Sequence, residues 1–328
     1  MKARCFALLA VAALTATALT GPAAAAPPVF AAAGTRSCTL PVGRTTLTLT
    51  SGGVERTALV TRPATRNPHQ ALPVVLNLHG SQMTAEEQEQ VSGMAAAAVE
   101  NGFLAVAPQG LLDASPGYRW NVPYVTGSDG PDDENFLIDV LDVLERSGCA
   151  DAGRVFGTGY SGGGREISQF ACDHPDRIAA IAPVSGLRAG APERREGGEI
   201  VPAAATCTPK RPVAVLTFHG DADPVNPYSG GGAAYWGYGA EAATRTWAHL
   251  NGCKSGPHKA GVSEHVDKVT FGGCRKGVRV QMYVVRGGGH TWPGAQGPEM
   301  AGLGAVTHEI DATGIMWDFF RVQDRAVR

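Results

Sequence analysis

The sequence predicts an α/β fold in which helices cover both faces of a mostly parallel central sheet, within a single domain. Continuous apolar runs such as Pro73–Leu78 are typical of strands buried on both faces. Amphipathic stretches such as Asp132–Ser147 alternate with these runs, as in repeated βα units. No long Ser/Thr/Pro-rich linker is present to separate a second module, so one domain is the simplest interpretation.

The expected elements begin at residue 45, where Thr45–Thr50 and Arg56–Thr61 alternate around a glycine turn and predict a hairpin. Further strands are expected at Pro73–Leu78, Phe103–Ala107, Arg154–Thr158, Ile178–Val184, Pro212–Phe218 and Val278–Val285. Helices are expected at Thr84–Glu100, Asp132–Ser147, Ser161–Cys172, Glu241–Leu250 and Glu309–Arg321. Thr84 and Glu87 have the spacing of a capping box. The Pro/Gly-rich stretch Leu187–Lys210 is expected to be a long loop.

The N-terminus has the pattern of a secretory signal peptide, with Lys2 and Arg4 before an apolar run and small residues. We expect cleavage near Ala25, or alternatively near Ala33. Residues 1–25 would then be the signal peptide, 26–37 a disordered Ala/Pro-rich segment, and 38–328 the catalytic domain. A membrane anchor is the alternative, but the apolar run Cys5–Thr20 is shorter than the ~20 residues that span a bilayer.

Composition excludes several classes of protein. Hydrophobic residues make up 44% and charged residues 18% of the chain, which favours a large core over disorder. The formal net charge is −2, and no basic stripe suggests a nucleic-acid partner or, once the signal is removed, a membrane. The 9 histidines are scattered without metal-ligand spacing, and no phosphate-binding loop or dinucleotide fingerprint occurs. We therefore expect no metal and no cofactor, and we expect a monomer.

The cysteines agree with export. Of 7 cysteines, Cys5 lies in the signal, which leaves an even number and predicts three disulfides. Cys253 and Cys274 would close a short hairpin-like excursion. Six cysteines allow fifteen pairings, and we assign the other two pairs, without a further argument, as Cys172–Cys207 and Cys38–Cys149.

A nucleophile motif lies between a predicted strand and a predicted helix. Gly159-Tyr160-Ser161-Gly162-Gly163 matches G-x-S-x-G, whose serine sits on a sharp strand-to-helix turn. Neighbours two positions either side come too close for a side chain, which explains Gly159 and Gly163. A glycine-rich structural turn is the alternative, but the strand–turn–helix context favours Ser161 as a nucleophile.

A serine nucleophile needs a base and an acid. His290 follows the strand Val278–Val285 and a glycine run, and is the expected base; a surface histidine is the alternative. Asp223 and Asp221 both follow the strand Pro212–Phe218. We favour Asp223 because it lies deeper in the loop and precedes proline, and we expect His219 to be a strand-end residue rather than a second base.

An oxyanion hole needs two N–H donors. Gly162, just after the nucleophile, and Ser81, after His79-Gly80, are the expected donors; an ordinary turn is the alternative at Ser81. Candidate substrate-binding residues are Gln82, Tyr160, Tyr228 and Trp292. Several aromatic residues suit an aromatic-accepting cleft and suit core packing equally well. They are the aromatics near the acid, Tyr228, Tyr235, Trp236 and Tyr238, together with Trp120 and Trp292.

Together these motifs resemble the secreted esterase family that joins feruloyl esterases and poly(3-hydroxybutyrate) depolymerases within the α/β-hydrolases. The matching segments include Leu78-His79-Gly80, Trp120-Asn121, Asp132-Asp133, Gly159–Gly164, Ala182–Gly186, His219–Gly231, Gly288–Gly294 and Trp317–Phe320. The resemblance covers about residues 38 to 321 and implies an α/β-hydrolase fold with a Ser161–His290–Asp223 triad.

Three departures separate this chain from parts of the family. Ser81 stands where members acting on the polyester often have cysteine, and the linker and polymer-binding module usual in extracellular depolymerases are not found in this sequence. Both differences weaken the solid-polyester interpretation. Glu134-Asn135 replaces a common Val-Gly pair, which we expect to affect only helix packing.

We therefore expect a secreted serine esterase that works through an acyl-enzyme on a polysaccharide-linked or oligomeric ester. Hydroxycinnamoyl (feruloyl) esters of plant polysaccharide are the first expectation, short hydroxyalkanoate esters the second and acetyl xylan the third. A secreted binding protein on an inactive hydrolase scaffold is the non-enzyme alternative. The intact elbow and all three triad positions argue against it.

Overall fold

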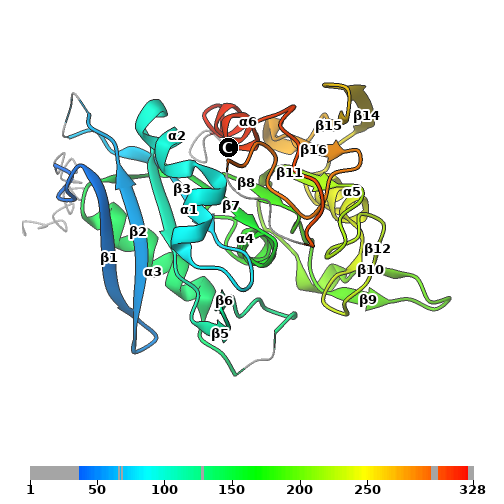
Figure 1. Cartoon of the computed structure of the whole chain (residues 1–328), viewed down its shortest axis with the longest axis horizontal. Coiled ribbons are helices and arrows are strands. Elements are labelled where there is room, and N and C mark those ends of the chain that lie inside the picture. The colour runs from blue at the N-terminus through cyan, green and yellow to red at the C-terminus, as the bar shows by residue number, and fades with distance from the viewer. Residues whose placement is uncertain (1–36, 66, 68, 127–128, 297–301, 324–328) are drawn as a thin grey trace, which may run out of the picture. The chain divides into compact units, whose positions relative to one another are not determined.

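A ten-stranded sheet runs through the computed structural model, in the order β1-β2-β4-β3-β7-β8-β11-β16-β15-β14 (Figure 1). The described residues are 37–65, 67, 69–126, 129–296 and 302–323. The expected signal peptide at 1–25 lies outside them, as do residues 26–36 of the expected disordered segment.

The ten strands span Gly43–Ser51 (β1), Val54–Arg62 (β2), Leu72–Leu78 (β3), Leu104–Pro108 (β4), Ala150–Tyr160 (β7), Ala180–Val184 (β8), Ala214–Gly220 (β11), Ser255–Gly261 (β14), Val266–Gly272 (β15) and Val280–Val285 (β16). The six strands from β4 to β16 run parallel, and antiparallel pairs extend both edges. Every residue of β3 and β11 is buried, as both-face burial of parallel strands requires. The predicted mostly parallel sheet is confirmed.

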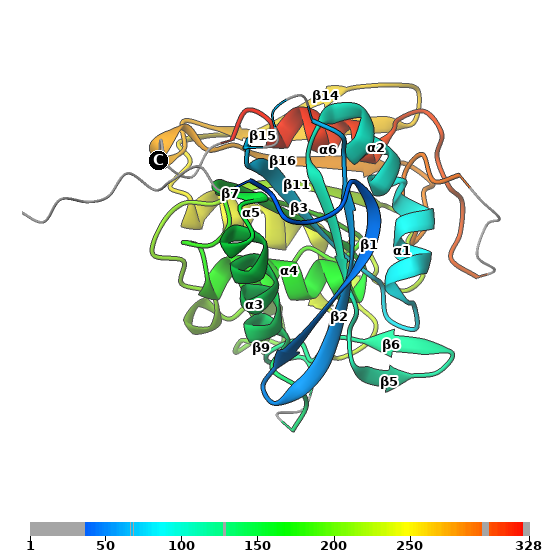
Figure 2. The same cartoon turned by 90° about the vertical axis from the view of Figure 1, so that its left-hand side faces the viewer.

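Helices lie on both faces of this sheet (Figure 2). They span Ala85–Ser92 (α1), Met94–Asn101 (α2), Asp133–Arg146 (α3), Gly162–Asp173 (α4), Ala240–Leu250 (α5) and Ala312–Phe320 (α6), with short 3₁₀ turns at Ala204–Thr206 and Arg275–Gly277. Consecutive residues of β3 enter different core clusters, because successive side chains of a strand point to opposite faces. Val74 packs in the cluster with residues of α3, α4 and α5, and Val75 packs in the cluster with residues of α2 and α6. No helix among the described residues has the length and apolarity needed to cross a membrane.

Three small hairpins lie outside the main sheet. They pair Leu112–Ala114 (β5) with Gly117–Arg119 (β6), Pro192–Arg194 (β9) with Ile200–Pro202 (β10), and Gly230–Gly231 (β12) with Gly237–Tyr238 (β13). The stretch Leu187–Lys210, expected to be a loop, therefore contains a hairpin of its own. Strands β14 and β15 form the hairpin-like excursion expected between Cys253 and Cys274. Their membership of the main sheet was not expected, because β14 is exposed along its whole length and has no apolar alternation.

The single helix expected at Thr84–Glu100 is two helices. Gly93 has φ of 63°, a left-handed conformation that ends α1 and starts α2. The capping box of Thr84 and Glu87 is confirmed, because the Glu87 N–H donates to Thr84 Oγ1 and the Thr84 N–H donates to Glu87 Oε2. An apolar count through this stretch missed a break that a single glycine permits.

The structure contains the three expected disulfides, Cys38–Cys149, Cys172–Cys207 and Cys253–Cys274. Cys253–Cys274 brackets the β14–β15 hairpin, as expected for a short excursion closed at its base. Cys38–Cys149 joins residues 111 positions apart, so it restricts the unfolded chain across β1 to α3.

The two-helix break provides a stability test. Replacing Gly93 with alanine meets no neighbouring atom, so its cost is the left-handed backbone alone, about 1–2 kcal/mol of unfolding free energy. Gly261→Ala is the matched control: it also meets nothing within 4 Å but has no positive φ, so it should be neutral or slightly stabilising. Urea denaturation of both variants measures the difference. Equal midpoints would contradict the assignment of strain to Gly93.

Candidate active site

Ser161 sits on the turn between β7 and α4. β7 ends at Tyr160 and α4 begins at Gly162, so a single residue makes the strand-to-helix turn. Ser161 has φ of 51° and ψ of −108°, a sparsely populated conformation that costs about 1–3 kcal/mol. Its N–H donates to the Val184 carbonyl of β8 at 2.9 Å, which holds the strained residue to the sheet.

The elbow glycines are required by close backbone packing. A Cβ on Gly159 would lie 2.4 Å from the carbonyl carbon of Gly163. A Cβ on Gly163 would lie 2.4 Å from the Leu78 carbonyl oxygen at the end of β3. Both distances are much shorter than a van der Waals contact, and the backbone atoms concerned cannot move away. This steric clash explains why the G-x-S-x-G pattern requires glycine at both positions.

Asp223 and His290 form a buried hydrogen-bonded pair. His290 Nδ1 lies 2.7 Å from Asp223 Oδ2, and both side chains are at most 4% exposed. The N–H groups of Val225 and Asn226 donate to Asp223 Oδ1, each at 2.8 Å. Burial raises the pKa of Asp223, but the hydrogen bond and charge of His290 outweigh this and leave that pKa below its ordinary value. An ionised Asp223 favours the Nδ1–H tautomer of His290, which leaves Nε2 as the basic nitrogen.

The alternative acid, Asp221, has a different partner. Its carboxylate accepts the Gly287 N–H at 2.7 Å on the exposed side of the loop. His219 Nε2 lies 2.8 Å from the Asn226 carbonyl and 3.4 Å from Asp223 Oδ2, and burial lowers the pKa of His219. His219 is therefore a strand-end residue with a hydrogen-bond partner, and Asp223 is the carboxylate that the fold brings to His290.

The two expected oxyanion donors lie next to each other. A Cβ built on Gly162 would be 3.2 Å from the Ser81 nitrogen and 2.4 Å from Ser81 Oγ. Gly162 is the first residue of α4, where the N–H groups have no acceptor within the helix. The Ser81 loop is held by the β6 strand, because the Gln82 N–H donates to the Tyr118 carbonyl at 2.8 Å.

A pocket of about 920 Å³ opens above these groups. Its lining includes Ser161, His290, Ser81, Gly162, Gln82 and Tyr160. Ligand pockets of drug-sized molecules have volumes in this range. The structure therefore brings six of the residues selected from the sequence to one cavity.

Three expected substrate contacts have other partners. Tyr228 and Trp292 are not among the residues that line this pocket in the described part of the chain. Trp292 is buried and donates to Thr313 Oγ1 at 3.1 Å, and Tyr228 packs edge-on against the His219 ring. Tyr160 does line the pocket, but its hydroxyl donates to the backbone carbonyl of His290, so it also holds the loop that carries His290. For Tyr228 and Trp292 the packing alternative is the one the structure favours.

Sequence reasoning missed Arg165 as a lining residue and left Trp120 and Tyr235 open between cleft and core. All three line the pocket, as do β5–β6 residues such as Asp113 and Arg119. Arg165 could have been selected from the sequence, because a residue four positions after Ser161 lies on the same face of the helix as Ser161. The β5–β6 hairpin had no comparable signal, because each strand has only three residues.

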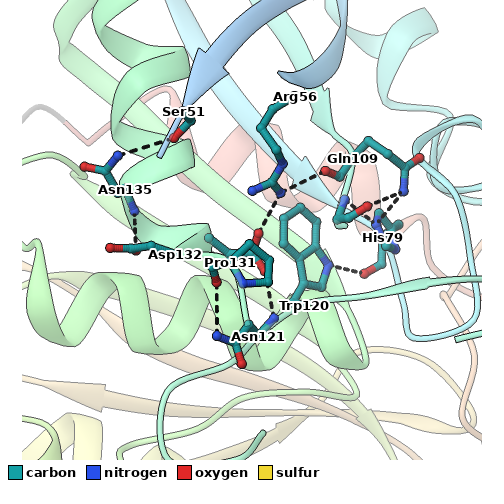
Figure 3. Close-up of polar contacts among 11 residues, drawn as sticks. Ser51, Arg56, His79, Gln109, Trp120, Asn121, Pro131, Asp132 and Asn135 are labelled. Carbon is teal, nitrogen blue, oxygen red and sulfur yellow. Dashed lines mark hydrogen bonds and ion pairs between the residues drawn. The ribbon is translucent and has the colours of Figure 1, made fainter. Parts of the chain in front are cut away.

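A buried polar network supports the wall beside Trp120 (Figure 3). Arg56 on β2 forms an ion pair with Asp133 at 2.6 Å, and both side chains are at most 2% exposed. Asp133 also accepts the Asn121 N–H at 2.7 Å, and the Asn121 amide donates to the Pro131 carbonyl at 3.0 Å. The family segments Trp120-Asn121 and Asp132-Asp133 thus meet in one contact, which fixes the pocket wall to the start of α3.

His79 connects this network to the oxyanion loop. Its Nδ1–H donates to the Gly80 carbonyl at 2.8 Å, and its Nε2 accepts the Gly110 N–H at 2.9 Å. The Trp120 indole donates to the His79 carbonyl at 2.8 Å (Figure 3). Burial lowers the pKa of His79 to about 4, so the ring is neutral at ordinary pH and suits this donor–acceptor arrangement.

The Glu134-Asn135 departure affects more than helix packing. The Asn135 amide donates to Ser51 Oγ at 3.3 Å, which connects α3 to the β1–β2 hairpin (Figure 3). Burial together with Asp173 and Asp132 raises the pKa of Glu134 to about 8.

No group of three or more His, Cys, Asp or Glu side chains suited to a metal occurs within the described ranges.

The fold of the chain is shared with a solved structure. An acetyl xylan esterase from Aspergillus awamori superimposes with a TM-score of 0.54 at 17% identity, covering 75% of this chain and 94% of that chain. The likeness concerns the fold, and the chain has the α/β-hydrolase fold.

Sequence comparison places the chain within that class. A putative esterase, NocK, from Nocardia uniformis subsp. tsuyamanensis is 30% identical over 269 residues, which cover 75% of this chain and 73% of NocK. Feruloyl esterase B from Piromyces equi is 29% identical over 242 residues, which cover 72% of this chain but only 42% of that protein. No family model matches the chain. The chain belongs to the feruloyl esterase-like family of α/β-hydrolase esterases, which confirms the resemblance in the motifs.

The contact of Asp223 with His290 predicts unequal effects at two neighbouring acids. Asp223→Asn should lower kcat for ester hydrolysis by about 10⁴-fold, because the wrong imidazole tautomer is favoured and the imidazolium loses its counter-charge. Asp221→Asn is the matched control and should retain kcat within a few-fold, because the Asp221 carboxylate accepts the Gly287 N–H on the exposed side of the loop rather than contacting His290. Steady-state kinetics on p-nitrophenyl butyrate distinguishes the two, and a larger loss at Asp221 would reject the pair.

His79 predicts a pH dependence of stability. The unfolded chain protonates His79 near its ordinary pKa of 6.5, whereas the folded ring stays neutral down to about 4. The unfolded state therefore binds more protons in this window, and the group costs up to about 3 kcal/mol of unfolding free energy as pH falls from 7 to 4. In His79→Gln this contribution should vanish. Urea denaturation of both proteins at pH 7 and pH 4 measures it, and parallel losses would contradict it.

Proposed function

We propose that this protein is a serine carboxylic ester hydrolase that works through an acyl-enzyme on Ser161. The observation that carries the proposal is the buried Asp223–His290 pair at the same pocket as a strained Ser161. A serine on a strained turn, in the same pocket as an oriented imidazole, is the arrangement that activates a serine hydroxyl. The family of the chain supports the same reaction class.

The proposed mechanism has two acyl-transfer steps. His290 Nε2 takes the Ser161 proton as Ser161 Oγ forms a bond to the ester carbonyl carbon. The N–H groups of Ser81 and Gly162 bind the developing oxyanion. Protonated His290 then gives its proton to the leaving alcohol as the ester C–O bond breaks. Water then attacks the acyl carbon as neutral His290 takes its proton, and protonated His290 returns that proton to Ser161 Oγ as the acyl–Oγ bond breaks and the acid is released.

For substrate, we propose hydroxycinnamoyl (feruloyl) esters attached to plant polysaccharide. Relatives from Piromyces equi and Aspergillus terreus are named feruloyl esterases, and one from Neocallimastix patriciarum is named a bifunctional acetylxylan esterase/xylanase. The rings of Trp120 and Tyr235 line the pocket and suit a planar aromatic acyl group. A cavity of about 920 Å³ is also larger than an acetyl group needs.

We propose further that the protein acts outside the cell. Three disulfides close within the described chain, and disulfides persist mainly in oxidising compartments. The signal-like N-terminus agrees with this location.

The proposed serine mechanism and the proposed substrate can be tested in one experiment. It measures hydrolysis of methyl ferulate, p-nitrophenyl butyrate and p-nitrophenyl acetate by the mature protein and by Ser161→Ala. We expect the variant to lose at least about 10⁴-fold in kcat on every ester. Ser255→Ala, on the exposed strand β14, is the control and should match the wild type.

Each outcome has a distinct meaning. Fast release of ferulate that depends on Ser161 supports the hydroxycinnamoyl substrate. Activity on the butyrate or acetate alone keeps the serine esterase and replaces the substrate with short hydroxyalkanoate or acetyl esters. Full activity in Ser161→Ala, or failure of a fluorophosphonate probe to label the wild type, would reject the serine mechanism in favour of an inactive scaffold.

A further inference from the structure

Arg165 places a buried cation in the wall of the candidate active site. It lies four residues after Ser161 on α4, lines the same pocket and is only 6% exposed. Its Nη2 lies 3.5 Å from Ser81 Oγ and 3.4 Å from the position that a Cβ on Gly162 would occupy. The guanidinium therefore borders both candidate oxyanion donors.

The protein does not neutralise this cation within its described residues. Arg165 Nε and Nη1 have no hydrogen-bond partner there, and the contact of Nη2 is the neutral hydroxyl of Ser81. The flat face stacks on the Tyr235 ring, with the guanidinium carbon 4.4 Å from the ring centroid. Arginine is over-represented where a carboxylate is recognised, because its planar fork matches that group.

The next residue, Glu166, does not serve as a counter-ion. Burial raises the pKa of its carboxyl well above the ordinary value. The charged groups that act on this pKa are Asp133, Glu134 and Asp132 at the start of α3, and Arg56 on β2. Both carboxyl oxygens of Glu166 lack a hydrogen-bond partner among the described residues. The helix thus separates Glu166 from the pocket face that Arg165 occupies.

A second buried arginine adds to the positive field. Arg188 is 2% exposed, stacks on Tyr238 at 3.7 Å, and its Nε and Nη2 have no partner in the described part of the chain. Burial lowers the pKa of Arg165 to about 10, an effect that Tyr235 opposes and Arg188 increases, so Arg165 stays charged at neutral pH. A buried charge without a partner is costly, which makes an anion from outside the chain favourable here.

The remaining charges of the pocket are weaker candidates for this role. Asp113 and Arg119 line the rim on the exposed β5–β6 hairpin, have opposite signs, and are screened by solvent. Asp223 is already bound to His290 and to two backbone N–H groups. Arg165 is a buried charge in the pocket lining, and it has no anionic hydrogen-bond partner among the described residues.

We propose that Arg165 makes this site select esters that carry a carboxylate close to the scissile ester group, such as an acidic sugar or hydroxy acid. The inference rests on the proposed esterase function and refines its substrate class. The carboxylate binds beside Nη2 and restores charge balance, and the low-dielectric wall strengthens its attraction.

Matched pairs of esters that differ only in this charge test the proposal. Monoethyl glutarate and ethyl 5-amino-5-oxopentanoate carry the carboxylate or its carboxamide on the acyl side. 3-Butyryloxybutanoate and 3-butyryloxybutanamide carry them on the alcohol side. The ratio of kcat/KM within a pair reports charge recognition, and a general loss of activity does not change it.

We expect the wild type to prefer the carboxylate at least about tenfold in one pair, which identifies the side of the ester that Arg165 contacts. Arg165→Gln should bring that ratio close to one, and Arg165→Lys should keep part of the preference because it keeps the charge. Arg119→Gln is the matched control, which removes the exposed pocket arginine and should leave the ratio unchanged.

A wild-type ratio near one in both pairs overturns the proposal, even if no variant folds. So does a preference that survives in Arg165→Gln or disappears in Arg119→Gln. Failure of the esterase function itself is distinguishable, because the protein would then show no Ser161-dependent hydrolysis of p-nitrophenyl butyrate at all.

Discussion

The tight backbone packing around Ser161 is the constraint on which the rest of this structure depends. Four chain segments meet there without side chains between them: the end of β3, the end of β7, the start of α4 and the turn after β8. A Cβ on Gly186 would lie 2.4 Å from the Ser161 carbonyl oxygen, much as those on Gly159 and Gly163 would strike backbone. The strained φ of Ser161 persists because moving any one of these segments would break the buried parallel sheet.

From this point the site is assembled by strand ends. β3, β7, β11 and β16 lie in one parallel group, so their carboxyl ends share one edge of the sheet. The loops after them carry the candidate oxyanion donors and the proposed nucleophile, acid and base. The buried Arg56–Asp133 pair then connects the pocket wall to β2 and α3.

The charges at the site are distributed unequally. Asp223 is fully engaged by His290, Val225 and Asn226, so its charge serves the imidazole. Arg165 has no anionic hydrogen-bond partner in the described chain, although it borders the candidate oxyanion donors. In a buried site, a charge that is hydrogen-bonded to protein groups orients those groups. A charge without such a partner attracts an oppositely charged group of a ligand that enters the pocket.

The sequence alone determined those features that depend on local chemistry. Apolar runs predicted the parallel strands, glycine spacing predicted the elbow, and an even cysteine count predicted three disulfides. These signals are local because burial on both faces, a turn without Cβ atoms and thiol pairing each restrict residue type at the position itself.

Only the tertiary structure decided which side chains meet. Asp223 rather than Asp221 contacts His290, Trp292 and Tyr228 pack away from the pocket, and Arg165 lines it. The split at Gly93 and the exposed strand β14 were likewise decided by backbone conformation and sheet pairing rather than by apolar pattern. Such contacts join residues far apart in the chain, and no local pattern records which face of a neighbouring element they will reach.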